Sequence, residues 1–207
     1  MSAPDLNALI GSRICHDLIS PLGAIGNGVE LLNMAGNVAG PELSLITGAV
    51  GNANARIRFF RVAFGAAGPG AMMGRAEILS ILDGVYHGGR LSVAWSAPGD
   101  QPRRLVRLGF LIVQCLEAML PWGGTITVTA EGDSWRFAGA GARIKRDDAL
   151  WALVMGGARP DDLAAADVHF ALVPAAAEDA GRQVSFQATE TGMIVSFCRC
   201  RRRLRDT

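Results

Sequence analysis

The most constraining feature of this sequence is a pair of apolar seams within its first 68 residues, each spaced like a helix that packs along another helix. In both seams the apolar side chains recur at alternating steps of three and four residues. This spacing places each set on one stripe of an α-helix and is typical of coiled-coil seams. The first seam contains Cys15, Leu18, Leu22, Ile25, Val29 and Leu32, and the second contains Leu43, Ile46, Val50, Ala53, Ile57, Phe60 and Phe64.

The segment 36–41 separates the two seams and predicts a tight connection between two antiparallel helices. It is rich in glycine, which suits a helix end, and Pro41 suits the first position of the next helix. A lone hairpin cannot cover both seams and a further apolar side of the first helix, whereas two hairpins can cover them as a four-helix bundle. We therefore expect residues 1–68 to form a homodimer, with a linker at 66–70.

The remainder of the chain alternates between helical and strand-like patterns, and it predicts a two-layer α/β sandwich over residues 71–207. The expected fold class is therefore α+β, with an N-terminal helical hairpin that forms a dimeric four-helix bundle, followed by this sandwich. Helices are expected at 75–87, 103–120, 147–155 and 161–180, and strands at 91–95, 125–130, 134–138, 183–188 and 192–198.

Charge and cysteine content exclude several classes of function. The formal net charge is +1, which gives no electrostatic reason to expect nucleic acid or a membrane surface as a partner. The four cysteines form no CxxC pair for zinc and are too sparse for a disulfide framework, so we expect no metal site. No stretch has the apolar length of a membrane span, and no leader pattern opens the chain. We therefore expect a cytoplasmic protein.

The window from Ile14 to Ile25 contains the residues best suited to chemistry. A neutral imidazole is a good nucleophile near neutral pH, and His16 lies one residue beyond the first seam, where it faces solvent. Asp17 can accept the ring proton or fix the tautomer. Pro21 removes the helical hydrogen bond to the Asp17 carbonyl, which predicts a local bend beside the histidine.

Neighbouring turns of the same helix supply candidate contacts for a partner protein. Arg13 is placed to offset phosphoryl charge, and Ile19 offers an apolar surface. The alternative is that His16 is an ordinary exposed helix histidine. His87 and His169 lack any comparable context. The candidate partner-binding residues are Ser12, Arg13, Ile19, Ser20 and Gly23.

The window around His16 resembles the H-box of histidine kinases, in which a histidine and an acidic residue precede a proline–leucine pair. The α/β half is similar in outline to the ATP-binding domain of that family. The nucleotide residues differ, however. The helix at 103–120 carries no asparagine to hold magnesium, Phe137 stands near the place of the adenine-binding aspartate, and no glycine-rich lid lies between 157 and 166.

With these departures, the chain resembles the ChpT-like histidine phosphotransferases of bacterial phosphorelays. The resemblance implies a homodimer that accepts a phosphoryl group on His16 from the receiver domain of a hybrid histidine kinase. It then passes the group to the receiver domains of response regulators, including those of the cell cycle. His16 and Asp17 would be the catalytic residues, and magnesium would come from the receiver. The chain would need no cofactor of its own and no ATP, and its degenerate ATPase domain would help to grip the receiver.

Two alternatives stay open at this point. One is an ATP-dependent sensor histidine kinase core with divergent nucleotide motifs. The other is a non-catalytic scaffold that binds a receiver through the bundle. Retention of His16 and Asp17 beside a decayed nucleotide site argues against the scaffold.

Overall fold

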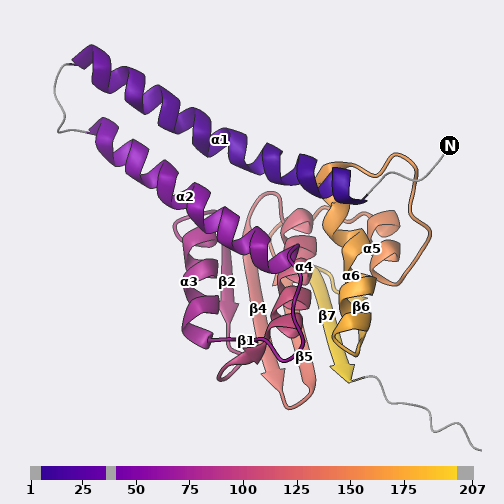
Figure 1. The fold of residues 1–207 in the computed structure, drawn as a ribbon. Coiled ribbons are helices and arrows are strands. Elements are labelled where there is room, and N and C mark those ends of the chain that lie inside the picture. The colour runs from indigo at the N-terminus through magenta and orange to yellow at the C-terminus, as the bar shows by residue number, and fades with distance from the viewer. Residues whose placement is uncertain (1–5, 36–40, 200–207) are drawn as a thin grey trace, which may run out of the picture.

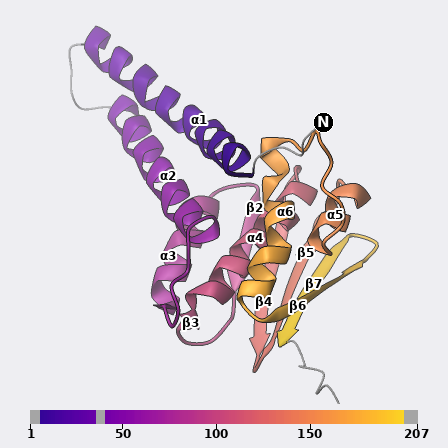
Figure 2. The ribbon, with the colours of Figure 1, turned by 45° about the vertical axis from the view of Figure 1, so that its right-hand side comes forward.

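The computed structural model describes residues 6–35 and 41–199, and it confirms a helical hairpin followed by an α/β sandwich (Figure 1). The hairpin consists of α1 (Leu6–Ala35) and α2 (Pro41–Ala63), which lie side by side. Helix α1 continues through Pro21 without a break in its helical assignment. Most of the connection predicted at 36–41 lies outside the described residues. Both views show the hairpin projecting well beyond the α/β half (Figure 2).

The α/β half is built on a mixed five-stranded sheet in the order β2-β4-β5-β7-β6. Only β2 and β4 pair in parallel, and the other neighbours are antiparallel. A separate pair of two-residue strands was not predicted, because so short a strand shows no alternation of side chains. The strands are β1 (Met72–Met73), β2 (Leu91–Trp95), β3 (Gln101–Pro102), β4 (Gly124–Glu131), β5 (Ser134–Ala140), β6 (Arg182–Ala188) and β7 (Gly192–Arg199).

The helices of this half cover one face of the sheet (Figure 2). They are α3 (Arg75–Tyr86), α4 (Arg103–Met119), α5 (Asp148–Val154) and α6 (Val168–Asp179). The helix predicted at 161–180 is wrong at its start, because α6 begins at Val168 after a 3₁₀ turn, η1 (Ala165–Asp167). The sequence just after Pro160 holds two aspartates, residues that favour turns and caps over helix interiors.

The core lies between the sheet and α4, and aromatic side chains fill much of it. Trp95 of β2 meets Trp135 of β5 edge-on, and Phe137 lies beside them in β5. Helix α4 approaches the sheet closely at Gly109, where a Cβ would come 3.1 Å from the Trp95 ring and 3.3 Å from Phe137. Glycine therefore sets the spacing of the two layers at this point.

The base of the hairpin joins the same core. Phe59 of α2 stacks on Phe110 of α4, with ring centroids 4.6 Å apart and planes 12° from parallel. Phe60 and Val62 are also buried in this cluster. The position of α1 and α2 relative to the α/β half is therefore set by packing rather than by a free linker.

The outer part of the hairpin, in contrast, leaves apolar side chains uncovered. Several large seam residues, together with Ile19 beside the first seam, are exposed in the single chain. These exposed residues are Ile19, Leu22 and Val29 on α1, and Leu43, Val50 and Ile57 on α2.

Within residues 6–35 and 41–199, no helix has the length and apolar character required to cross a membrane.

Candidate functional site

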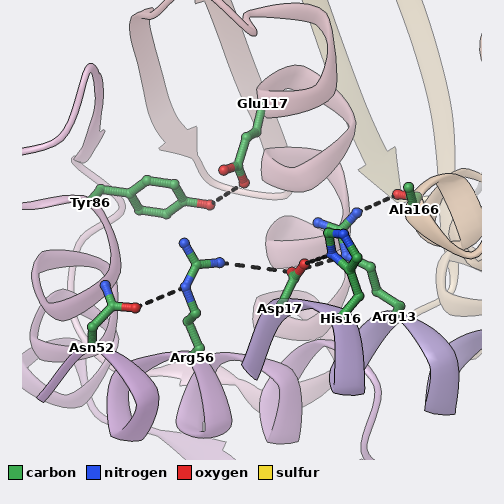
Figure 3. A network of polar contacts seen from close by, with 8 residues as sticks. All are labelled: Arg13, His16, Asp17, Asn52, Arg56, Tyr86, Glu117 and Ala166. Carbon is green, nitrogen blue, oxygen red and sulfur yellow. Dashed lines mark hydrogen bonds and ion pairs between the residues drawn. The ribbon is translucent and has the colours of Figure 1, made fainter. Parts of the chain in front are cut away.

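His16 lies beside Asp17 on α1, with one ring nitrogen engaged (Figure 3). Its side chain is 81% exposed, whereas that of Asp17 is only 10% exposed. The ring Nδ1 lies 3.1 Å from Asp17 Oδ1. An ionised carboxylate only accepts hydrogen bonds, so this contact assigns the proton to Nδ1 and leaves the lone pair of Nε2 free.

Two arginines approach the second carboxylate oxygen of Asp17 (Figure 3). The Oδ2 atom lies 3.0 Å from Arg13 Nε and 3.8 Å from Arg56 Nη1. Each arginine also donates a hydrogen bond to another group: Arg13 Nη1 donates to the Ala166 carbonyl at 2.6 Å, and Arg56 Nε donates to Asn52 Oδ1 at 3.1 Å. Asp17 therefore lies at the centre of a charged cluster that joins α1, α2 and η1.

Arg13 is engaged by groups of the chain itself. Sequence reasoning expected its charge to offset that of the phosphoryl group, and the structure places its guanidinium beside Asp17 and the Ala166 carbonyl. The four-residue spacing of Arg13 and Asp17 on one helix was a signal for this ion pair. Arg56 had no such signal, because α2 brings it to Asp17 only through the packing of the hairpin.

A groove of about 540 Å³ runs between α1 and α2 beside the His16 ring. It is open because most of its lining side chains are small, and a Cβ added at Gly48 would meet nothing within 4 Å. Of the predicted partner-binding residues, Ser20 lines this groove, whereas Ser12, Ile19 and Gly23 are exposed on α1 outside it. The groove is lined by His16, Asp17, Ser20, Pro21 and Ala24 of α1 and by Ser44, Leu45, Gly48, Ala49, Asn52 and Arg56 of α2.

Two polar side chains of α4, Gln114 and Glu117, lie beneath the hairpin. Tyr86 donates a hydrogen bond of 2.9 Å to Glu117 Oε2 (Figure 3). Burial raises the pKa of the Glu117 carboxyl, and burial together with the Glu117 charge raises the pKa of the Tyr86 hydroxyl. The remaining space among these residues, Gln114 and the hairpin base is about 10 Å³, close to that of one water molecule.

The cleft between α4 and helices α5 and α6 is similarly filled. Trp151 and Phe170 pack edge to face there, with ring centroids 5.6 Å apart, and a space of about 30 Å³ remains. His169 lies next to Phe170 and is 1% exposed, as expected for a packed helix residue. Within the described part of the chain neither of its ring nitrogens has a hydrogen-bond partner. Burial, and then the nearby Arg13 charge, lower the pKa of His169 to about 3.

Comparisons with known proteins agree on one family. The sequence model described as the histidine phosphotransferase C-terminal domain matches residues 75–192. The protein phosphotransferase ChpT of Brucella abortus (strain 2308) is 33% identical over 204 residues, which cover 95% of this chain and 96% of that protein. A solved structure described as a bacterial phosphotransferase aligns with a TM-score of 0.77 and 30% identity, over 95% of this chain and 97% of its own. The similarity therefore includes the hairpin as well as the α/β half.

Proposed function

Because the chain belongs to the family of ChpT-like histidine phosphotransferases, we propose that His16 carries the phosphoryl group between receiver domains in a phosphorelay. The group would come from the receiver domain of a hybrid histidine kinase and pass to the receiver domains of response regulators, including regulators of the cell cycle. The observation that supports this role best is the exposed imidazole whose Nδ1 contacts Asp17, because this contact leaves Nε2 as the nitrogen for attack.

In this reaction the Nε2 lone pair of His16 attacks the phosphorus of a receiver aspartyl phosphate. The new N–P bond forms as the P–O bond to the receiver carboxylate breaks, and that carboxylate leaves with the bonding electrons. The proton stays on Nδ1, so the phosphorylated ring carries a positive charge beside Asp17 Oδ1. Magnesium on the receiver would neutralise the charge of the transferring group. The second receiver aspartate attacks the same phosphorus and reverses these steps.

The groove beside His16 is the proposed docking face for the receiver. Its small side chains allow a partner element to approach the His16 ring closely. The groove also includes Ser20, one turn along α1 from His16. Exposed Ser12, Ile19 and Gly23 would extend the contact along α1. The α/β half would support the receiver from the side.

We expect the chain to use no ATP of its own. Phe137, which stands near the position of the adenine-binding aspartate, is fully buried in the aromatic core. Helix α4 presents Glu117 to Tyr86 rather than to a ligand, and Trp151 occupies the cleft beside it. These contacts support a domain that is retained for its shape and not for a nucleotide.

The exposed stripe on α1 and α2 supports a homodimer. Clustered exposed apolar residues often mark an interaction surface, and a second hairpin would cover these in a four-helix bundle. The groove at His16 is lined by α1 and α2 of one chain, so each protomer would hold a complete site. The free thiols of Cys15, Cys115 and Cys198 suit a reducing compartment, and we place the protein in the cytoplasm.

A phosphotransfer assay tests the proposal. Purified wild type and His16→Ala are each mixed with a receiver domain that carries labelled aspartyl phosphate. We expect label on the wild type only. Equal labelling of His16→Ala would overturn the role of His16. A parallel reaction with labelled ATP and no receiver distinguishes the phosphotransferase from the kinase alternative. Only the kinase alternative predicts labelling of the wild type under those conditions.

A further inference from the structure

We propose that Arg13 and Arg56 are positioning residues for phosphotransfer, and that Arg13 makes the reactive pair depend on the docked α/β half. The inference rests on the proposed function, in which His16 is the phosphoacceptor. Both guanidinium groups lie on Asp17 Oδ2, and this leaves Oδ1 for His16 Nδ1.

The two oxygens of Asp17 have separate partners. The last torsion of an aspartate side chain is broad, so a free carboxylate would rotate and present either oxygen to the ring. Cations on Oδ2 restrict that rotation, and Oδ1 then stays 3.1 Å from the ring. A ring held by Oδ1 keeps its proton on Nδ1, whereas an unheld ring exchanges its proton between the two nitrogens.

Burial is unequal across the cluster. The Arg13 and Arg56 side chains are 19% and 32% exposed, and Asp17 is 10% exposed. Charge attraction is stronger at such shielded positions than in a fully solvated surface pair. The two arginines therefore hold Asp17 in a shielded position, and the His16 ring that Asp17 orients remains open to a partner.

The two arginines have different anchors. Arg56 is held by Asn52 of the same helix, so its contact lies within the hairpin. Arg13 is held by the Ala166 carbonyl of η1, at the start of the segment that leads into α6. A shift of α6 relative to α1 would therefore move the guanidinium that holds Asp17. In this way the α/β half contributes to the chemistry without binding a nucleotide.

The first test measures the tautomer of the His16 ring directly. The full-length protein is labelled with ¹⁵N-histidine, and the ring nitrogen shifts report the tautomer of His16, with His87 and His169 as internal references. We expect the Nδ1–H tautomer in the wild type and a mixture of both tautomers in Arg13→Gln and Arg56→Gln. Arg58→Gln is the matched control, because Arg58 is exposed on α2, and its tautomer should equal that of the wild type.

The conservative variants separate positioning from a loss of structure. Arg56→Lys keeps one cation near Oδ2 and should restore the wild-type tautomer. Arg13→Lys should not, because an ammonium lacks the fork that contacts Asp17 and Ala166 together. A wild-type tautomer in Arg13→Gln and Arg56→Gln would overturn the proposal, and so would equal rescue by both lysines.

The kinetic test uses Arg13, which does not line the groove. Arg13→Gln should lower kcat for phosphoryl transfer by about tenfold or more, because orientation is lost, and leave the KM for the receiver unchanged. A raised KM with unchanged kcat would contradict positioning. If His16→Ala still accepted the label, the proposed function would fail, while the tautomer measurement would still decide the role of the two arginines.

Discussion

At the scale of single residues, the site depends on two neighbours in sequence that face different environments. Consecutive residues of an α-helix point about 100° apart, so His16 reaches solvent while Asp17 turns toward α2. Their exposed fractions, 81% and 10%, follow from this rotation. A histidine and an acidic residue in direct succession on a half-buried helix can therefore combine an accessible nucleophile with a fixed partner.

The first prediction at this scale concerns the groove. Gly48→Leu places a large side chain in the groove, and its Cβ position is open, since nothing lies within 4 Å of it. We expect the KM for the receiver to rise by at least about tenfold, which corresponds to about 1.4 kcal/mol, with kcat little changed. The measurement is steady-state phosphotransfer at varied receiver concentration.

Gly51→Leu is the matched control, because Gly51 is exposed on the same helix, outside the groove, and its Cβ position is also open. Both variants should unfold at the same or higher denaturant concentration than the wild type, since leucine favours helix over glycine by up to about 1 kcal/mol. A receiver KM raised equally by both substitutions would show that the groove is not the docking face.

The second prediction concerns His169 and acid. The native state holds this buried ring neutral, with a pKa of about 3. The unfolded chain binds a proton at the ordinary value of about 6.5, so between the two values the unfolded state carries more protons. The free energy of unfolding should therefore fall as pH drops below about 6.5, by up to about 1.4 kcal/mol per pH unit from this group.

Urea unfolding of wild type and His169→Phe, at about pH 7.5 and about pH 5.5, measures this contribution. The phenylalanine keeps an aromatic ring in the site but cannot bind a proton. The wild type should lose more stability between the two pH values than the variant loses. Equal losses would mean that the imidazole does not change its protonation on unfolding.

At the scale of elements, the sequence predicted regular segments well and irregular ones poorly. The seams indicated α1 and α2, because apolar residues on one face of a helix recur at steps of three and four residues. Strand alternation likewise indicated β4, where Ile126 and Val128 face the core. The start of α6 was missed, since η1 depends on tertiary contacts with α1 and not on local pattern. Strands β1 and β3 were missed because each spans only two residues, too few to show alternation.

The prediction at this scale is that the exposed stripe holds two hairpins together. Val50→Glu places a charge in the middle of that stripe, where burial of an unpaired carboxylate is strongly unfavourable. Light scattering coupled to gel filtration should show the mass falling from twice 21.8 kDa to 21.8 kDa. Met155→Glu, at an exposed apolar position after α5, is the control and should remain dimeric. A dimeric Val50→Glu would place the interface elsewhere.

At the scale of the whole molecule, the reactive residues were accessible to sequence reasoning and their supports were not. His16 and Asp17 stand together in one short motif. The contacts of Arg56 with Asp17, and of Arg13 with Ala166, join segments that are 39 and 153 residues apart in the chain (39 is 56 minus 17). The first contact follows from the packing of α1 against α2. The second follows from the docking of the hairpin on the α/β half, which Phe59 and Phe110 fix through their stacking.

That docking also leads to the last prediction, which concerns ATP. Gln114 and Glu117 of α4 lie under the hairpin, and Trp151 and Phe170 fill the neighbouring cleft. A nucleotide with a Kd of about 10 µM, supplied at about 1 mM, would stabilise the folded state by about 2.7 kcal/mol. In a chain of this length each kcal/mol raises Tm by about 2–4 °C, so binding would be plain in a thermal melt.

We expect no rise in Tm when magnesium and ATP are added to the full-length protein. An active histidine kinase ATPase domain, melted under the same conditions, serves as the positive control and should shift by several degrees. Trp151→Ala opens the cleft and tests whether packing alone excludes the nucleotide. Because Phe137 and Glu117 would still face their present partners, this variant should also show no shift. A rise of several degrees in the wild type would mean that the α/β half opens to accept ATP, and would return the kinase alternative to consideration.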